Sequence, residues 1–550
     1  MFQFPRLLSL LCFVFFISCN EESKTINSSD DVSSLNADSL KHDLAIISSD
    51  SFMGRKPFTE GETKTIDYLQ KRMKEIGLEP GNGTSYLQAV PMVNIEATAA
   101  PQMEVKSPNS NFNLKAFDEY VIWTDKTDPA ISLENTPLVF AGYGVVAPEY
   151  NWNDYAGLDV KGKVVMVMVN DPGFWSGDNT LFKGDTMTYY GRWTYKFEEA
   201  GRQGAKGCLV IHNTRAASYP FSVQQNSFNT SRLGLDNRGK EEKNCDMIGW
   251  ISEPATNKLF KAAGYDSTLL IKANVRGFKA VPLNLQVSTT MKVKATYDKS
   301  YNVIGKITGT KRPDEVIIYT AHWDHLGIGR PDATGDSIYN GALDNGSGTA
   351  GLIELARAFK NMKTKPERSI IFLSVTAEEQ GLLGSQYYAE NPVYSVDSTV
   401  GNINMDVLSP FSKTKDMVVV GQGQNDLEDY LKKEVEKTGG YISFDTHPEA
   451  GGYFRSDHFS FAKVGIPSLS AEGGIDVVGK GKEEGLKRNK DYNDHHYHQP
   501  SDNYDPSWTM EGAINDLQVL YNVGMRLAFE DSWPKWKAGS EFKAIREKKK

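Results

Sequence analysis

The sequence predicts a mixed α/β fold, in which a largely parallel sheet is sandwiched by helices and interrupted by an inserted β-rich domain. Three observations carry this prediction. In residues 294–540, short apolar runs alternate with segments of helical periodicity, as in parallel sheets that are covered on both faces. In residues 134–293, β-branched runs lie between glycine turns. The 550 residues are also too many for one ordinary hydrophobic core.

The first region, residues 37–133, contains one clear helical segment, ETKTIDYLQKRMKEIGLEP (residues 62–80). Its apolar residues recur at helical spacing: Ile66, Leu69, Met73 and Ile76. Gly77 and Pro80 follow, and both residue types end helices. We therefore predict a helix that stops near residue 77.

The second region, residues 134–293, predicts a small α/β insertion. The runs TPLVFAGYGV (136–145) and KGKVVMVMVND (161–171) have the composition of strands. Residues 194–213 predict a helix, a glycine turn and a strand. The combination of GKVVMVMV with AGRQGAKGCLVI resembles the protease-associated domain, which implies a module that covers a cleft. An unrelated α/β insertion is the alternative.

The third region, residues 294–540, alternates strands and helices. Strands are predicted at residues 316–321, 369–375, 400–404 and 416–420, and helices at residues 349–362, 427–437 and 512–529. In sheets of this kind, ligands bind beyond the carboxyl ends of the strands. Polar residues that directly follow these strands are therefore the candidates for a functional site.

The N-terminus has the features of an export signal. Arg6 precedes an apolar run (residues 7–17) that is too short to span a bilayer, and a small residue and Cys19 follow. The ending FISC resembles a bacterial lipobox, although Phe16 stands where an aliphatic residue is usual. The resemblance implies removal of residues 1–18, lipid attachment at Cys19 and an outer-membrane lipoprotein that faces the periplasm or the cell surface. An ordinary secretory signal is the alternative.

Composition narrows the remaining possibilities. Residues 19–36 are rich in Ser, Asn, Asp and Glu and predict a flexible tether. The net charge is −9 and no long basic stretch is present, so we expect no nucleic-acid partner and no membrane contact beyond the anchor. Cys208 and Cys245 are either a disulfide or two buried thiols.

Several ionisable residues lie just beyond the predicted strands or in glycine-rich loops. In chain order they are His322, Asp324, Asp344, Glu378, Glu379, Asp406 and His498. Each has a plainer interpretation by itself: a structural histidine, a solvated turn or a helix cap. Their joint order at one predicted sheet edge favours a shared site.

This ordered set resembles the di-zinc exopeptidase family of bacterial leucine aminopeptidases, whose relatives include glutamate carboxypeptidases and glutaminyl cyclases. The matching segments are His-x-Asp, Asp-Asn-x-Ser-Gly, Glu-Glu, Asn-x-Asp, Tyr-His-x-Pro-x-Asp and the N-terminal MGRKP (residues 53–57). The resemblance implies that residues 37–133 and 294–540 form the peptidase domain, with the protease-associated domain inserted between them.

The resemblance also implies a role for each residue. Asp344 would bridge two Zn²⁺ ions, with His322 and Asp406 on one ion and Glu379 and His498 on the other. Asp324 would orient the imidazole of His322, and Glu378 would be the general base. A mixed histidine and carboxylate set suits zinc. Adjacent glutamates on an extended backbone point opposite ways, so one can bind metal while the other faces substrate.

We therefore expect a secreted zinc metallopeptidase, most plausibly an aminopeptidase acting on peptides with a free N-terminus. A carboxypeptidase, a glutaminyl cyclase and a non-catalytic receptor-like protein are the alternatives. Further candidates are Arg455 as a substrate anchor, with Asp457 and His458 behind it, and Trp323, Tyr339 and Tyr453 as pocket walls. His325, His495 and His496 lie next to the assigned positions, and His495 or His496 could replace His498 as a ligand.

Overall fold

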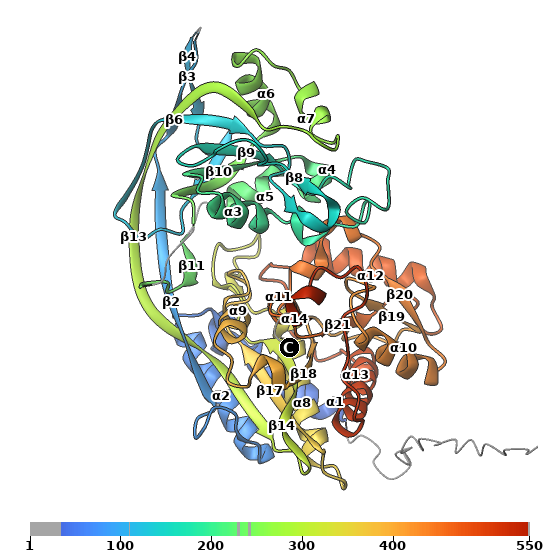
Figure 1. Ribbon diagram of the computed structural model, residues 1–550. Coiled ribbons are helices and arrows are strands. Elements are labelled where there is room, and N and C mark those ends of the chain that lie inside the picture. The colour runs from blue at the N-terminus through green and yellow to red at the C-terminus, as the bar shows by residue number, and fades with distance from the viewer. Residues whose placement is uncertain (1–34, 109, 228–230, 240–243, 548–550) are drawn as a thin grey trace, which may run out of the picture.

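The computed structural model describes residues 35–108, 110–227, 231–239 and 244–547. The predicted signal peptide, Cys19 and nearly all of the tether lie outside these ranges. The chain folds into a main part and an inserted part (residues 100–280), which two long strands connect (Figure 1). Within the described ranges, no helix combines the length and apolarity needed to cross a membrane.

The main part is built on a mixed sheet whose centre is parallel. In spatial order its strands are β2 (Leu87–Ala99), β13 (Val281–Ile307), β17 (Arg368–Val375), β14 (Arg312–His322), β18 (Thr399–Asn404), β21 (Ser468–Gly473), β19 (Asp416–Val419) and β20 (Tyr441–Phe444). The strands β17, β14, β18 and β21 run parallel, so their carboxyl ends meet at one edge. The predicted fold class is confirmed.

Helices cover both faces of this sheet. They are α1 (Ala37–Ile47), α2 (Glu60–Ile76), α8 (Gly348–Lys360), α9 (Leu383–Glu390), α10 (Leu427–Lys437), α11 (His458–Lys463), α12 (Lys482–His495) and α13 (Glu511–Phe529). Helix α2 ends at Gly77, whose φ of 83° is left-handed, as the sequence predicted. The sequence had not indicated α12, because only Gly485 in it is buried and no apolar stripe exists.

The inserted part has its own core, and its strands continue the main sheet through β13. Its strands are β3 (Gln102–Lys106), β4 (Asn111–Lys115), β5 (Tyr120–Trp123), β6 (Ala130–Phe140), β9 (Val164–Met168), β10 (Gly207–Ile211) and β12 (Met247–Ile251). Its helices are α3 (Trp193–Arg202), α4 (Thr214–Ala217), α5 (Phe221–Ser227), α6 (Glu253–Ala262) and α7 (Thr268–Lys272). The remaining short elements are β1 (Glu79–Pro80), β7 (Val146–Ala147), β8 (Trp152–Asn153), β11 (Arg232–Leu235), β15 (Gly327–Ile328), β16 (Ile338–Tyr339) and α14 (Lys543–Glu547).

The sheet pairing moves the start of the inserted part from the predicted residue 134 to about residue 102. Strand β5 pairs with β12, and β3 pairs with β13 at Ser288. These partners lie more than a hundred residues away along the chain, so the local composition of residues 102–123 could not reveal them. The identity of the insertion as a protease-associated domain stays a prediction.

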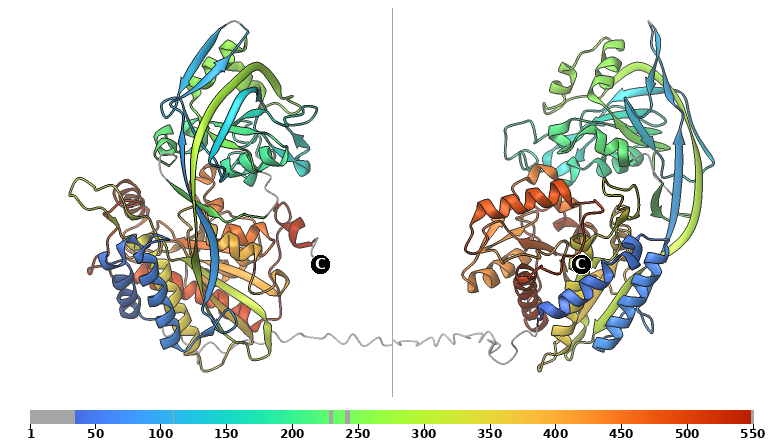
Figure 2. Two further views of the ribbon diagram at one scale, coloured as in Figure 1. Left: turned by 90° about the vertical axis from the view of Figure 1, so that its left-hand side faces the viewer. Right: turned by 180° about the vertical axis from the view of Figure 1, so that it is seen from behind.

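Strands β2 and β13 form a long antiparallel ribbon along one side of both parts (Figure 2). A second contact joins the parts near the end of the main sheet. The Met187 N–H donates to the Pro448 carbonyl at 3.1 Å, and Lys463 pairs with Glu198 at 3.1 Å. The inserted part therefore rests on the loop that follows β20.

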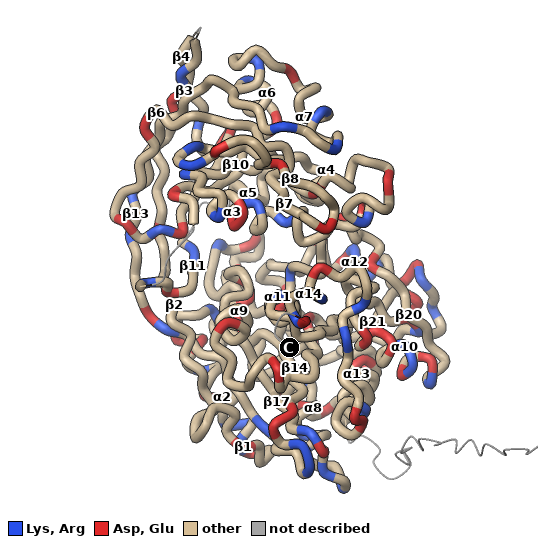
Figure 3. The backbone as a smooth tube through the Cα atoms, viewed as in Figure 1, with Lys and Arg blue, Asp and Glu red and all other residues tan. Residues whose placement is uncertain are grey.

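Charged residues of both signs are interspersed over the two parts (Figure 3). Cys208 and Cys245 are buried free thiols in one core of the inserted part. Burial raises the pKa of Cys245 to about 12 and the pKa of Cys208 further above its ordinary value. Of the two possibilities that the sequence left open, the structure has the unpaired thiols.

Candidate metal centre

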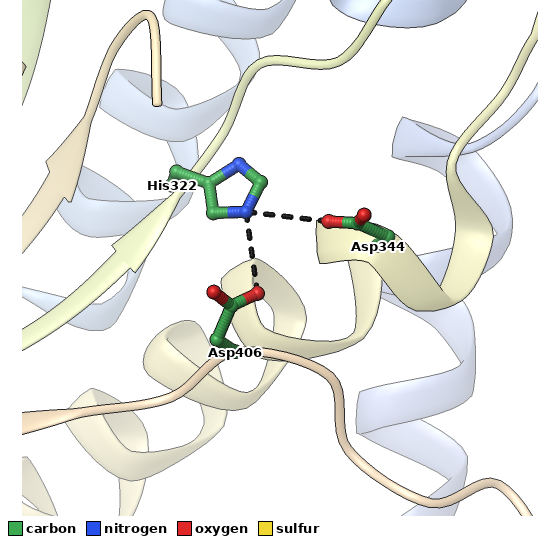
Figure 4. Close-up of side chains that lie close together, drawn as sticks. All are labelled: His322, Asp344 and Asp406. Atoms are coloured by element: carbon green, nitrogen blue, oxygen red, sulfur yellow. Dashed lines mark hydrogen bonds and ion pairs between the residues drawn. The ribbon is translucent and has the colours of Figure 1, made fainter. Parts of the chain in front are cut away.

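The first candidate ligand, His322, is the last residue of β14. This strand is buried from Val316 onward because parallel neighbours lie on both sides. The His322 Nε2 atom lies 3.3 Å from an Asp344 oxygen and 3.3 Å from an Asp406 oxygen (Figure 4). Burial alone lowers the pKa of His322, but the carboxylates of Glu378 and Asp406 outweigh it and hold that pKa well above its ordinary value.

Asp344 stands between two histidines. One of its oxygens faces His322, and the other lies 3.1 Å from the Nε2 atom of His498. The residue sits in η4 (Ala342–Ser347), an irregular π-turn that opens α8, with φ −101° and ψ 101°. Burial raises the pKa of Asp344, but hydrogen bonds from the two histidines outweigh it and leave the pKa well below its ordinary value. One carboxylate thus presents one oxygen to each side, as a bridging ligand must.

The turn that carries Asp344 depends on a glycine. Gly341 has a φ of 55°, and a Cβ atom there would lie 2.2 Å from the Asp344 carbonyl and 2.5 Å from the His325 ring. Asp502 accepts hydrogen bonds from the backbone of Leu343 (3.0 Å) and Asp344 (3.1 Å). These local contacts fix the direction in which the Asp344 carboxylate points.

The adjacent glutamates follow β17 and differ in surroundings. Glu379 lies 3.2 Å from the Nε2 atom of His498. Burial raises the pKa of Glu379, but His498 and His325 outweigh it and bring the pKa to about 2. Glu378 has only a distant contact to His322 (3.9 Å), and burial raises its pKa well above the ordinary value. The environments of the two glutamates therefore differ: two histidines stabilise the anion of Glu379, whereas burial destabilises the anion of Glu378.

Asp324 lies beside the His322 imidazole and contacts it through two groups. Its carboxylate lies 3.7 Å from the Nδ1 atom of His322, and the Asp324 backbone carbonyl makes the shorter contact at 3.2 Å. The carboxylate also accepts the backbone N–H groups of Glu378 (3.0 Å) and Glu379 (3.4 Å). Asp324 thus joins the His322 loop to the glutamate turn, and burial raises its pKa to about 7.

Asp406 follows β18, and a serine supports it. One of its oxygens faces His322, and the other accepts the Ser456 hydroxyl at 2.5 Å. Ser456 in turn accepts a hydrogen bond from Asn404 at 2.8 Å. One oxygen of Asp406 therefore faces the cluster, and the other is held by the Ser456 hydroxyl.

His325 is closer to the cluster than the sequence analysis assumed. Its Nδ1 atom lies 2.6 Å from Glu379, and its Nε2 atom is buried without a hydrogen-bond partner. Two triads have their ligand atoms within 4.8 Å of one another: His322, Asp344 and Asp406, and His325, Asp344 and Glu379. Since His498 also contacts Asp344 and Glu379, both histidines border the second triad.

The other histidines of the same loop lie elsewhere. His495 pairs with Asp491 at 2.9 Å on the exposed side of α12, and His496 faces the Ser501 carbonyl at 2.9 Å. The structure therefore brings His498, and neither neighbour, to the cluster. Trp323 and Tyr453 are buried in the packing, so neither is free to line a pocket.

The sequence analysis noted MGRKP only as part of a resemblance and missed what Arg55 does. Its guanidinium is buried and donates to the carbonyls of Trp323 (2.8 Å), Asn340 (2.5 Å) and Gly341 (2.9 Å). It thereby clamps the loops that carry His322 and Asp344. Burial lowers the pKa of Arg55 to about 10, although the cluster carboxylates oppose that shift.

Two further carboxylates border the cluster. Both oxygens of Asp457 are buried without a hydrogen-bond partner among the described residues, and burial raises its pKa to about 7. Glu472 lies on β21 two residues beyond Ser470, which pairs with Asn404, so it stands beside Asp406. Burial and then Asp406 raise the pKa of Glu472 to about 8.

Known proteins resemble this chain in several ways. Residues 302–521 match the model of Peptidase family M28. The chain is 32% identical over 341 residues to "Aminopeptidase YwaD" of Bacillus subtilis, covering 60% of this chain and 58% of that protein. It is 29% identical over 322 residues to "Probable glutamate carboxypeptidase" of Arthroderma benhamiae, covering 54% of this chain and 38% of that protein. The chain thus spans only part of these relatives.

Among solved structures, an aminopeptidase from Aneurinibacillus sp. strain AM-1 aligns with a TM-score of 0.49 at 19% identity, covering 92% of this chain and 95% of that one. A zinc aminopeptidase from Bacillus subtilis aligns with a TM-score of 0.43 at 19% identity, covering 90% and 96% of the two chains.

Proposed function

We propose, from the premise that residues 302–521 belong to Peptidase family M28, that this protein is a zinc-dependent aminopeptidase that removes N-terminal residues from peptides. The observation that carries the proposal is the position of Asp344, which presents one oxygen to His322 and the other to His498. A carboxylate in that position suits two cations held side by side.

The donor set fits zinc. Each side of Asp344 offers imidazole nitrogen and carboxylate oxygen, the ligand types that bind Zn²⁺. The set also carries more buried carboxylates than the cations that face it, an arrangement that is costly unless positive charge enters. We assign His322 and Asp406 to one ion, Glu379 and His498 to the other, and Asp344 to both.

When bound, zinc would lower the pKa of a coordinated water and polarise the scissile carbonyl. Glu378 faces this position without a short hydrogen bond to any histidine. Its raised pKa suits a group that accepts a proton from the attacking water and then donates it to the leaving amine. Asp324 fixes the backbone of Glu378 and Glu379, so it positions the base and a ligand together.

Glu472 favours an aminopeptidase over the other activities of this site. It stands beside Asp406, where burial and neighbouring carboxylates raise its pKa, and it forms no ion pair with a cation among the described residues. A substrate α-ammonium group bound there would supply the missing positive charge. Removal of one residue at a time would follow, because only the chain terminus carries that group.

The first test compares leucine p-nitroanilide with its N-acetyl derivative. We expect hydrolysis of the free amine only, loss of activity on chelation and recovery with zinc. Glu378→Gln should lower kcat by about 10²–10⁴-fold, the usual contribution of a general base, while the zinc content stays the same. Glu390→Gln, an exposed glutamate on α9, is the matched control. Unchanged turnover in Glu378→Gln would remove that residue from its role.

A carboxypeptidase is the second candidate, favoured by Arg192 and Arg455, which form no ion pair within the described residues and could bind a substrate carboxylate. Hydrolysis of N-acetylated peptides with a free C-terminus would establish it in place of the aminopeptidase. Cyclisation of peptides with N-terminal glutamine would instead indicate a glutaminyl cyclase.

We further propose that the protein is exported and anchored at Cys19, and that the insertion is a protease-associated domain that covers the cleft. The apolar run before Cys19 supports the first proposal, and the contact of Met187 with Pro448 supports the second. Metabolic labelling with an alkyne fatty acid should mark the wild-type protein, and Cys19→Ala should abolish that label.

A further inference from the structure

An arginine of the inserted part lies without an anion at the boundary with the main part. Arg192 directly precedes α3, and its Nε atom is buried with no hydrogen-bond partner. No carboxylate within the described residues forms an ion pair with it. Burial, and then Arg455, lower its pKa to about 10. A buried guanidinium nitrogen without a partner is unfavourable, which marks a place where an acceptor is missing.

The main part contributes the second arginine. Arg455 is exposed and forms no ion pair in the described part of the chain. Arg455 follows Gly451 by four residues, and the Arg192 side chain packs against this segment. A Cβ atom on Gly451 would be 3.5 Å from the Arg192 side chain. Both arginines act electrostatically on Tyr219. Burial raises the pKa of Tyr219, and Arg192 and Arg455 oppose that shift. Both guanidinium groups therefore belong to the boundary around the Gly451 segment and act on the same tyrosine.

That place borders the candidate metal centre. Arg455 directly precedes Ser456, whose hydroxyl donates to Asp406. A peptide that presents its scissile bond to the cluster would reach the arginines within about two residues, at roughly 3.3 Å per extended residue.

We propose that Arg192 and Arg455 together bind the C-terminal carboxylate of short peptides, so that the protein prefers dipeptides and tripeptides with a free C-terminus. Guanidinium groups bind carboxylates through paired, charge-assisted hydrogen bonds. With Glu472 beside Asp406, the site would bind both the N-terminal ammonium group and the C-terminal carboxylate of a short substrate. This inference rests on the proposed aminopeptidase function.

The test compares kcat/KM for Leu-Gly-Gly, Leu-Gly-Gly-amide and Leu-Glu-amide, with leucine p-nitroanilide as the reference. We expect the free acid to be preferred over its amide by about 10–100-fold, the value of one charged hydrogen bond, mainly through KM. Arg455→Gln and Arg192→Gln should bring that ratio close to one. Arg276→Gln, an exposed arginine four residues after α7, should keep it.

A binding measurement distinguishes a failure of this inference from a failure of the proposed function. The Kd of Leu-Gly-Gly and of its amide, measured by calorimetry on zinc-loaded Glu378→Gln protein, should show the same preference without turnover. Equal affinity for the two, or a preference that survives both arginine substitutions, would overturn the inference even if leucine p-nitroanilide is cleaved. A preference for Leu-Glu-amide would overturn it in favour of an acidic side chain. If Arg192→Gln misfolds, Arg192→Lys keeps the charge and should lose part of the ratio.

Discussion

Each part of the molecule buries a group of charged side chains, and the two groups are completed differently. In the inserted part, the Lys196 ammonium donates to the carbonyls of Asn170 (2.8 Å) and Tyr190 (2.6 Å). Asp171 accepts the Thr188 N–H and hydroxyl at 2.9 and 2.7 Å. Groups of the inserted part itself therefore supply these hydrogen-bond partners of Lys196 and Asp171. In the main part, carboxylates face one another across two or three histidines.

The difference teaches how to separate a structural cluster from a functional one. Buried charges are tolerated when their own chain neutralises and hydrogen-bonds them. The inserted cluster meets that condition, and its lysine lies between two aspartates. The cluster around Asp344 does not meet it, since Asp457 and one nitrogen of His325 have no partner among the described residues. It needs cations from outside.

The largest effect is expected at the bridging carboxylate. Asp344→Asn should reduce hydrolysis by at least about 10³-fold, because the two zinc ions proposed for this site would lose a shared anionic ligand. Zinc per chain, measured by mass spectrometry, should fall with it. The metal-free variant should unfold at no lower temperature than metal-free wild type, because one buried negative charge is gone. Asp314→Asn, on an exposed position of β14, is the control; full zinc in the Asp344 variant would contradict the bridging role.

The second prediction concerns the buried charged cluster of the inserted part. Lys196→Met should lower the free energy of unfolding by about 2–6 kcal/mol, about 1–3 kcal/mol for each buried group left unsatisfied, because the carbonyls of Asn170 and Tyr190 lose their donor. Thermal and denaturant unfolding would measure it, and zinc content should stay the same. Lys161→Met, at an exposed position, should change little. Equal stability of the two variants would show that the inserted cluster is not a structural one.

The third prediction concerns pH and a buried acid away from the ligands. Asp516 on α13 accepts the Gly473 N–H at 3.0 Å, and burial raises its pKa from 3.8 to about 7. Because the folded pKa lies above the unfolded pKa, its contribution to stability is complete below pH 3.8 and is lost as pH rises through about 7.

Asp516→Asn keeps the acceptor and removes this loss. The variant should match wild type near pH 4 and exceed it at pH 8 by up to about 4 kcal/mol, at 1.36 kcal/mol per pKa unit. Urea unfolding across that range would measure the difference. A difference that does not depend on pH would place the charge of Asp516 in solvent.

The smallest effect is expected at His325. It contacts Glu379 at 2.6 Å, so His325→Ala should weaken zinc binding by about 10–100-fold, as loss of a residue that orients a ligand does. Competition with a chelator of known affinity would measure this. His447→Ala, an exposed histidine of the main part, is the control. A complete loss of one zinc ion would instead make His325 a ligand itself.

Much of the fold could be predicted because its signals are local. The spacing of Leu69 and Met73 predicts the buried face of α2, and the left-handed Gly77 ends it. Buried parallel strands read as continuous apolar runs, which predicted β14 and β17. The sequence did not predict the polar helix α12 or the start of the inserted part, because neither has a local apolar pattern.

The sequence by itself determined which residues are candidate ligands and at which strand ends they stand, because residue type and position along the chain decide both. Only the tertiary structure decided which atoms face each other. It turned the Asp324 carboxylate to the glutamate turn, placed His325 on Glu379 and brought Arg192 to Arg455. Such contacts join residues that are far apart in the chain. Packing and loop conformation determine them, and neither leaves a periodic pattern in the sequence.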